Sequence, residues 1–336
     1  MKYKGEEIIA AGWSGDDRDK WIGSKAVEFI WDIIDICNYR CTYCGAGYGC
    51  DKSRPPGVFF KDSNMNSAWE SVISRLKVKT IPDFTIDLLG GEPTLHPELK
   101  QLVDVLRSMD KCIEVSITTN LSKPVKYFKQ FQVDGCSKLI ITPSLHFEYC
   151  TQKTIDKIVE MAASGYRVHV PVMLHCNEKY WPMIRLAITT FIDKNVQYGL
   201  TFLESAHGYK SNYDTKFFEY FDDLLSIPTI SQAIIKDATA WNASERQTGT
   251  DDLYPIITTK QKYMVTPMEI EQYNIKQFKG WRCTPTTWRI TEYGKIVNAC
   301  TGEPLHILGK NIRGETNCPL DKCDCNVRWN YEKYKE

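Results

Sequence analysis

The sequence predicts an α/β protein built on a partial (β/α)6 barrel, followed by a small C-terminal domain of one β-hairpin and loops. Two observations predict the barrel. Short β-branched apolar runs alternate with segments of helical period, and glycine-rich or polar motifs follow several of those runs. A third observation predicts the C-terminal domain, because a hairpin pattern and a group of cysteines share the end of the chain.

Six apolar runs have the character of parallel strands, at residues 27–36, 84–89, 113–119, 139–144, 167–174 and 197–203. Two intervening segments have apolar residues at the spacing of a one-faced helix: Leu99, Leu102, Val103 and Leu106, then Ile155, Ile158, Val159 and Ala162. Parallel strands with right-handed helical crossovers curl into a barrel. We therefore expect the functional site at the carboxyl ends of these strands.

The pattern divides the chain into four parts. Residues 1–26 form an N-terminal extension, 27–204 the barrel, 205–280 connecting helices and loops, and 281–336 the C-terminal domain. In the last part, two short strand-like runs at 287–291 and 295–299 flank Gly294, which predicts a hairpin.

Composition excludes some classes of partner. The 336 residues include 42 basic and 42 acidic side chains, so no net charge attracts a polyanion and we expect no nucleic-acid partner. The first residues lack the apolar run of a signal peptide, and no segment approaches the roughly 20 apolar residues of a membrane span. We expect a cytoplasmic protein without a membrane partner.

The 13 cysteines fall mainly into two groups. Grouped cysteines without an export signal indicate metal or redox chemistry rather than disulfides. Cys112 and Cys136 stand alone beside apolar runs, and we expect them to be buried packing thiols.

The first group is Cys37, Cys41 and Cys44, separated by three and two residues in a loop after the first predicted strand. Thiolates this close can bind one iron–sulfur cube. Zinc is the alternative metal, but a structural zinc site takes four ligands, and three leave a position open. Cys50 could supply a fourth ligand, which would make the protein an electron carrier.

This loop, with Tyr43 before its last cysteine and a βα pattern around it, resembles the radical S-adenosylmethionine (radical SAM) superfamily over residues 27–203. The resemblance implies that a [4Fe-4S] cluster binds S-adenosylmethionine at its fourth iron. One electron then cleaves the sulfonium to a 5′-deoxyadenosyl radical, which abstracts a substrate hydrogen atom, while the protein positions the reacting carbon. An electron donor such as flavodoxin or ferredoxin is implied as well.

A second motif supports the resemblance. Gly90, Gly91, Glu92 and Pro93 match the GGEP element that contacts the methionine amino group of the cofactor in this superfamily. Glycines there let the backbone approach a ligand closely. Further cofactor contacts are implied at polar residues after later strands: Thr119, Asn120, Ser144 and Asn177. Each of these could equally be a turn or cap residue, and His146 could be a core histidine.

The second group of cysteines resembles the twitch or SPASM extension, which binds auxiliary iron–sulfur clusters. Five cysteines are available, which fits one auxiliary [4Fe-4S] cluster: Cys283, Cys300, Cys318, Cys323 and Cys325. The pair that brackets the hairpin and the pair near the end are the preferred ligands, with Cys318 in reserve. A zinc knuckle is the alternative.

The sequence does not decide the outcome of the radical reaction. Re-reduction of a substrate radical needs a hydrogen donor, and Cys50, Cys150 and Cys176 are candidates that could also be packing thiols. Few residues precede the first predicted strand, whereas many peptide maturases of this group carry a leader-binding domain there. We therefore expect a small, sugar-like substrate that is dehydrogenated or epimerised. The alternatives are a peptide-modifying maturase (an epimerase or cross-linking enzyme), a non-catalytic iron–sulfur electron carrier and a zinc-dependent interaction protein.

Overall fold

The computed structural model describes residues 1–11, 26–44, 63–79, 81–132, 138–203, 212–225, 254–265, 270, 273–275, 277–283, 287–291, 294–298, 316–318 and 333–335. No helix in these ranges is long and apolar enough to cross a membrane.

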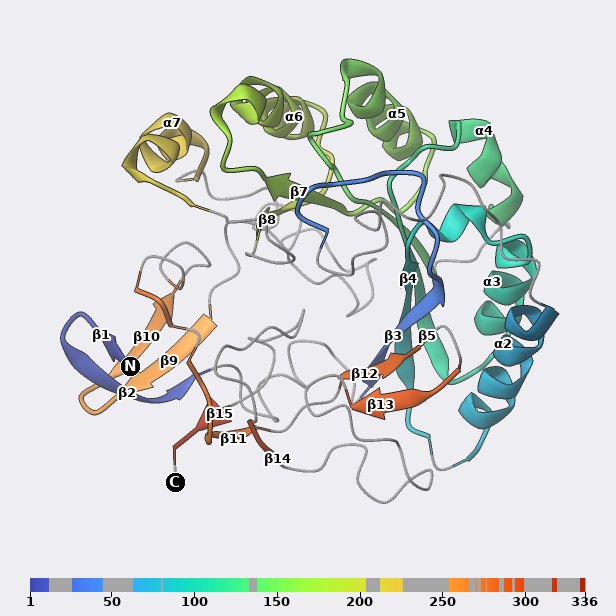
Figure 1. Ribbon diagram of the computed structural model, residues 1–336, viewed down its shortest axis with the longest axis horizontal. Coiled ribbons are helices and arrows are strands. Elements are labelled where there is room, and N and C mark those ends of the chain that lie inside the picture. The colour runs from blue at the N-terminus through green and yellow to red at the C-terminus, as the bar shows by residue number, and fades with distance from the viewer. Residues whose placement is uncertain are drawn as a thin grey trace.

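The six predicted strands form an open barrel (Figure 1). Four of them pair in parallel in chain order: β3 (Val27–Ile34), β4 (Phe84–Gly90), β5 (Cys112–Thr119) and β6 (Leu139–Pro143). The other two, β7 (Val170–Leu174) and β8 (Tyr198–Phe202), pair in parallel with each other. Parallel bridges from Ile141 to Val168 and from Leu145 to Val172 join β6 to the β7 side. The predicted partial (β/α)6 barrel is therefore confirmed.

Helices lie on the outside of this arc (Figure 1): α2 (Ser63–Leu76), α3 (Leu99–Arg107), α4 (Val125–Phe128), α5 (Gln152–Ala163), α6 (Trp181–Asp193) and α7 (Thr215–Leu225). Short 3-10 turns η1 (Pro93–Leu95), η2 (Lys129–Phe131) and η3 (Glu178–Tyr180) accompany them. The apolar face predicted for α3 is fully buried. On α5, Ile155 and Ile158 are buried, while Val159 and Ala162 pack partly buried against the same core.

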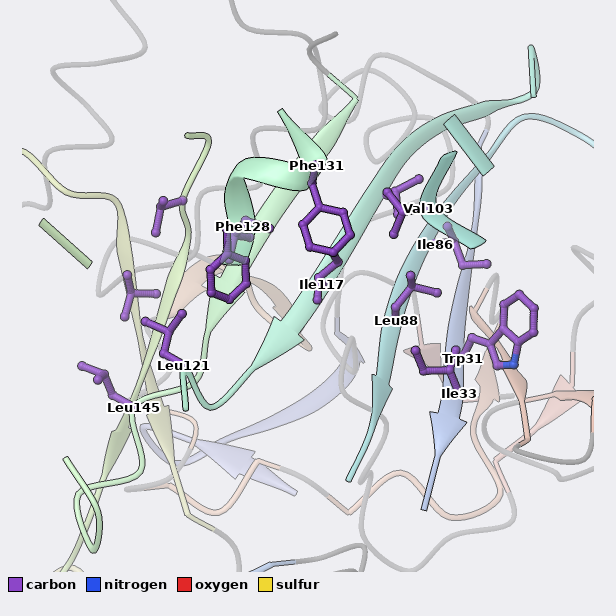
Figure 2. Packing of buried hydrophobic residues seen from close by; sticks show 14 of the residues in the cluster. Trp31, Ile33, Ile86, Leu88, Val103, Ile117, Leu121, Phe128, Phe131 and Leu145 are labelled. Atoms are coloured by element: carbon purple, nitrogen blue, oxygen red, sulfur yellow. The ribbon is translucent and has the colours of Figure 1, made fainter. Parts of the chain in front are cut away.

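The two faces of the barrel sheet differ in polarity. Figure 2 shows Trp31, Ile86 and Ile117 on the side of the sheet that packs against helix residues such as Val103. Because side chains alternate along a strand, the residues between them point to the inner face. These inner residues are largely polar: Glu28, Asp32, Thr85, Asp87, Glu114, Ser116 and Thr118. The barrel therefore has an apolar core under its helices and a polar inner wall.

The predicted C-terminal hairpin is present as β12 (Thr287–Ile290) and β13 (Ile296–Asn298), which are antiparallel. The sequence did not predict its location. Strand β12 pairs in parallel with β3, so the hairpin extends the barrel sheet at its first edge. The Thr287 hydroxyl donates to Glu28 at 2.9 Å, and the Arg289 guanidinium pairs with Asp32 at 2.5 Å. These contacts attach the end of the chain to the inner wall.

A second sheet, in the order β10-β9-β2-β15-β11-β14, combines both ends of the chain. Its strands are β2 (Glu6–Ala11), β9 (Tyr254–Thr258), β10 (Lys262–Val265), β11 (Arg282–Cys283), β14 (Thr316–Asn317) and β15 (Lys333–Tyr334), and β1 (Lys2–Tyr3) pairs with β2. The sequence did not predict these strands. β1 and β2 lie in the N-terminal extension, and the region expected to hold connecting helices and loops contains the β9–β10 hairpin. Both depend on pairing between distant segments, which local patterns do not reveal.

Candidate active site

The three cysteines of the first group lie together at the carboxyl end of β3. Cys44 donates its backbone N–H to the Cys41 carbonyl at 3.1 Å, and the Tyr39 N–H donates to the Cys37 sulfur at 3.3 Å. Burial raises the pKa of Cys37 to about 11, and nearby Glu92 and Cys44 add to the increase. Burial also raises the pKa of Cys41, and nearby Glu148, Cys37 and Cys44 raise it further. The thiols are therefore close enough to influence one another.

The donor set of this loop fits an iron–sulfur cube. Among the residues that the structure describes, no three His, Cys, Asp or Glu side chains are grouped as ligands of one metal ion. A cube does not require such a group, because each thiolate ligates a different iron. Such ligands surround the cluster instead of converging on one point. Cys50 lies outside the described residues, so its role as a fourth ligand stays a prediction.

The glycine pair of the GGEP motif packs directly against the chain that leads into the cysteine loop. The Gly91 N–H donates to the Ile34 carbonyl at 2.7 Å, and the Glu92 N–H donates to the Ile36 carbonyl at 2.8 Å. A Cβ on Gly91 would lie 2.0 Å from the Ile36 oxygen, and one on Gly90, whose φ is 130°, would lie 2.0 Å from the Ile34 oxygen. Only glycine permits this approach. The pair therefore sets the path of the backbone into Cys37.

The carboxylate of Glu92 is fully buried. It accepts hydrogen bonds from the Thr94 N–H at 3.1 Å, the Thr94 hydroxyl at 2.5 Å, the Thr119 hydroxyl at 2.6 Å and the Asn120 N–H at 2.7 Å. Three of these donors bond Oε1 and one bonds Oε2. Pro93 begins η1 and is buried. The buried carboxylate therefore links the end of β4 to the end of β5.

The structure brings three of the other predicted residues to the same edge. Thr119 donates to Glu92, and the Ser144 N–H donates to the Thr119 carbonyl at 2.8 Å. The Asn120 amide donates to the Asn38 side chain at 2.9 Å and to the Cys37 sulfur at 3.8 Å.

Asn177 is the fourth predicted residue, and it is exposed. Its side chain accepts from the Lys179 N–H at 3.1 Å as the N-cap of η3. The contact of each of these four residues with a cofactor stays a prediction.

A segment in which the sequence singled out only His146 also holds the cysteine loop. Residues 146–149 follow β6, and we call them the β6 brace. The Tyr149 hydroxyl accepts from the Arg40 N–H at 2.9 Å, and Glu148 accepts from the Thr42 N–H at 2.9 Å. The position of the brace after a barrel strand is the signal that could have identified Glu148 and Tyr149.

Two imidazoles flank the aromatic ring of Tyr43. The Tyr43 hydroxyl lies 3.0 Å from His146 Nδ1, and the centre of its ring lies 5.4 Å from that of His175. Burial lowers the pKa of His146 to about 4. Burial also lowers the pKa of His175 below its ordinary value. Nearby Glu148 opposes both decreases but is the smaller effect. Both imidazoles are therefore neutral at neutral pH. They act as hydrogen-bonding and packing groups rather than as charges.

The candidate hydrogen donors differ in what the structure says of them. Cys150 and Cys176 are half-buried, and Cys50 lies outside the described residues. Burial raises the pKa of Cys150 to about 12, which keeps it a thiol, and its sulfur donates to the Thr151 carbonyl at 3.7 Å. Their role as donors stays a prediction. Cys112 is fully buried in the core, which confirms it as a packing thiol, whereas Cys136 lies outside the described residues.

Two cysteines of the second group lie on neighbouring strands. Cys283 pairs with Thr316, and the Cys318 N–H donates to the Trp281 carbonyl at 2.8 Å, so the ladder continues past β14. Both cysteines are buried, and the alternation along each strand places them on the same face of the sheet. The remaining members, Cys300, Cys323 and Cys325, lie outside the described residues.

Comparison with known proteins finds relatives of this chain, although no protein-family model matches it. A GTP 3',8-cyclase of Haemophilus influenzae is 23% identical over 160 residues, which cover 44% of this chain and 45% of the relative. An S-adenosylmethionine-dependent nucleotide dehydratase of Fibrobacter sp. is 32% identical over 98 residues, or 29% and 28% of the two chains. The structure of native anSMEcpe with bound AdoMet superposes with a TM-score of 0.50 at 15% identity, over 85% of this chain and 78% of that one.

The fold and the site define a class of protein in which a cysteine loop lies at the carboxyl edge of an open α/β barrel. Within that class, the chain belongs to the radical SAM superfamily. The matched regions span less than half the length of these two curated relatives. The solved structure supports the shared fold.

Proposed function

We propose that this chain is an enzyme that holds a [4Fe-4S] cluster with Cys37, Cys41 and Cys44 and cleaves S-adenosylmethionine reductively. When bound, the cluster and the sulfonium cofactor supply a 5′-deoxyadenosyl radical that abstracts a hydrogen atom from the substrate. One observation carries the proposal. Three neighbouring thiols lie at the carboxyl edge of the barrel, where the ends of β5 and β6 contact their loop and the end of β4 contacts the chain that leads into it.

The residues of the chain have separate tasks in this proposal. Gly90 and Gly91 direct the backbone from β3 into the loop, and buried Glu92 connects the ends of β4 and β5 beneath it. On the other side, Cys41 and Tyr43 form a small buried cluster with Leu203, which limits access of water. Exclusion of water protects a reactive radical from side reactions.

The inner wall of the barrel supports a small substrate that carries several hydroxyl groups. Asp87 accepts from the Thr118 hydroxyl at 2.9 Å, and the hydroxyls of Ser116 and Thr142 lie 2.8 Å apart. Carboxylates and hydroxyls bind sugar hydroxyls well, whereas carboxylates repel phosphate groups. We therefore place the sugar ring of the substrate, whether a free sugar or part of a nucleotide, against this wall. The two curated relatives are named for reactions on nucleotides, and the sugar of a nucleotide is compatible with the same wall.

The test of this function is release of 5′-deoxyadenosine. Anaerobically reconstituted protein is incubated with dithionite and S-adenosylmethionine, and the product is quantified by chromatography. We expect the wild type and the control variant Cys112→Ala, which removes a core cysteine, to form the product. Cys41→Ala should lose it. An equal yield from Cys41→Ala would contradict the proposal.

We also propose that the second group of cysteines holds an auxiliary [4Fe-4S] cluster. The shared face and burial of Cys283 and Cys318 support this, and they make Cys318 a first-choice ligand rather than a reserve. A variant that lacks Cys37, Cys41 and Cys44 should retain about four irons, the content of one cube. Adding Cys318→Ser to that variant should remove them. Zinc in place of iron would support a structural zinc site instead.

A further inference from the structure

The β6 brace contacts the cysteine loop at four of the positions that lie between or beside the ligands. The ring of Tyr149 stacks on Tyr39 with centroids 4.3 Å apart, and its hydroxyl accepts from the Arg40 N–H at 2.9 Å. His146 contacts the Tyr43 hydroxyl at 3.0 Å. These contacts come from a segment about a hundred residues away in sequence. The loop is therefore shaped against another barrel strand end.

Glu148 makes the most specific of these contacts. One carboxylate oxygen accepts from the Thr42 N–H at 2.9 Å, and the other accepts from the Thr42 hydroxyl. The same carboxylate lies 3.6 Å from His175 Nε2 and so also reaches the end of β7. Only 11% of its side chain is exposed. Thr42 follows Cys41 directly and precedes Cys44 by two residues, so Glu148 fixes the backbone in the centre of the ligand loop.

We propose that Glu148 is a positioning residue that holds the cysteine loop in the shape that binds the cluster. The inference deepens the proposed function and depends on it for the identity of the bound group. Its physical basis is loop entropy. The loop has no helix or strand of its own between Cys37 and Cys44, so ordering it for three ligands costs conformational entropy. Charge-assisted hydrogen bonds from a fixed carboxylate offset that cost before iron arrives.

This role differs from support of the fold in general. The contacts of Glu148 described above join it to the cysteine loop and to His175, not to the apolar core beneath the helices. Loss of the carboxylate should therefore loosen the cluster loop and leave the barrel stable. A glutamine can replace both contacts with Thr42, because its oxygen accepts from the N–H and its NH₂ donates to the hydroxyl.

The experiment measures how fast the first cluster loses iron to an excess of a ferrous-iron chelator under anaerobic conditions. Iron released by the variant without Cys37, Cys41 and Cys44 is subtracted, so that the first cluster alone is counted. Glu148→Ala should release iron about tenfold faster than the wild type, the factor that corresponds to about 1.4 kcal/mol. Glu148→Gln should restore the wild-type rate. Glu160→Ala removes an exposed glutamate from α5 and is the matched control.

The thermal midpoint of the iron-free proteins completes the test. We expect the three variants to unfold within a few degrees of the wild type. Equal iron release from Glu148→Ala and Glu160→Ala would overturn the inference, and so would a large loss of thermal stability in Glu148→Ala. If the wild type holds the cluster but forms no 5′-deoxyadenosine, the proposed function fails while the iron-release comparison still decides the role of Glu148. A wild type that binds no iron overturns both.

Discussion

The hydroxyl of Thr119 donates to the buried carboxylate of Glu92 at 2.6 Å, and this contact joins two motifs that are separated by 27 positions in sequence. Glu92 belongs to the GGEP motif at the end of β4, and Thr119 ends β5. Because the Asn120 side chain reaches Cys37 from the same strand end, Glu92 connects both motifs to the ligand loop. Parallel strands allow this, since their carboxyl ends share one edge of the sheet.

The four hydrogen bonds of Glu92 predict a stability defect in Glu92→Gln. In the wild type both carboxylate oxygens accept hydrogen bonds. Glutamine replaces one of these oxygens with an NH₂ group, so at least one buried donor loses its acceptor. We expect the free energy of unfolding of the iron-free protein to fall by about 1–3 kcal/mol in urea titrations. Glu160→Gln, on the exposed face of α5, should change it by less than about 0.5 kcal/mol. Equal values for the two variants would show that the buried hydrogen bonds are not the cause.

The close approach at Gly91 predicts that even an alanine is not tolerated there. Its Cβ would lie 2.0 Å from the Ile36 carbonyl oxygen, so the backbone that leads to Cys37 must move. Gly91→Ala should therefore lower the free energy of unfolding by about 3 kcal/mol and reduce bound iron. Gly165→Ala is the control, because nothing lies within 4 Å of its Cβ and only its φ of 82° is strained. The control should cost about 1 kcal/mol and keep its iron. Similar iron contents in both variants would argue against a role of Gly91 in the loop.

The contact between Asn120 and Cys37 predicts an effect on the reduction potential of the first cluster. A hydrogen bond to a cluster thiolate stabilises the added negative charge of the reduced state. Asn120→Ala should lower the midpoint potential by roughly 40 mV, which corresponds to about 1 kcal/mol for one electron. A redox titration monitored by electron paramagnetic resonance measures it. Asn177→Ala, which removes an exposed cap on η3, should leave the potential unchanged. An unchanged potential in Asn120→Ala would show that the 3.8 Å contact has no electronic role.

Burial lowers the pKa of His169 to about 4, and this predicts a loss of stability in acid. The unfolded chain binds this proton below its ordinary pKa of about 6.5, whereas the folded chain binds it only near pH 4. Stability therefore falls as the pH falls through this window. Between pH 7 and pH 5, the unfolding free energy of the iron-free wild type should fall by about 2 kcal/mol more than that of His169→Gln, at 1.36 kcal/mol per pKa unit. Parallel pH profiles for the two proteins would contradict the assignment.

Local patterns were sufficient for the parts of the molecule that repeat one unit. The apolar period of residues 99–106 predicted the buried face of α3, and the alternation of strand and helix predicted β3 to β8. The hairpin around Gly294 was also predictable, because its two strands are adjacent in sequence. Each of these features depends on residues within one turn or one strand of each other.

Contacts between distant segments were not predictable in this way. Glu148 meets Thr42 across 106 positions, and Arg289 meets Asp32 across 257. Neither pair leaves a periodic signal, because each depends on which strand ends the fold brings together. The same reason applies to β2, which is a strand through its pairing with β9 and β15. The motif residues therefore lie at one edge of the barrel, where the sequence predicted them, but the motifs gave no sign of the contacts that Glu148 and Tyr149 make with the cysteine loop.

The most direct test of the account is the electron paramagnetic resonance spectrum of the reduced protein before and after addition of S-adenosylmethionine. Three thiolates leave one iron of the cube open, so binding of the cofactor at that iron should change the spectrum of the first cluster. The change should be absent in Cys41→Ala. A wild-type spectrum that stays the same at saturating cofactor would mean that a fourth protein ligand closes the cluster, and the protein would then be an electron carrier rather than a radical enzyme.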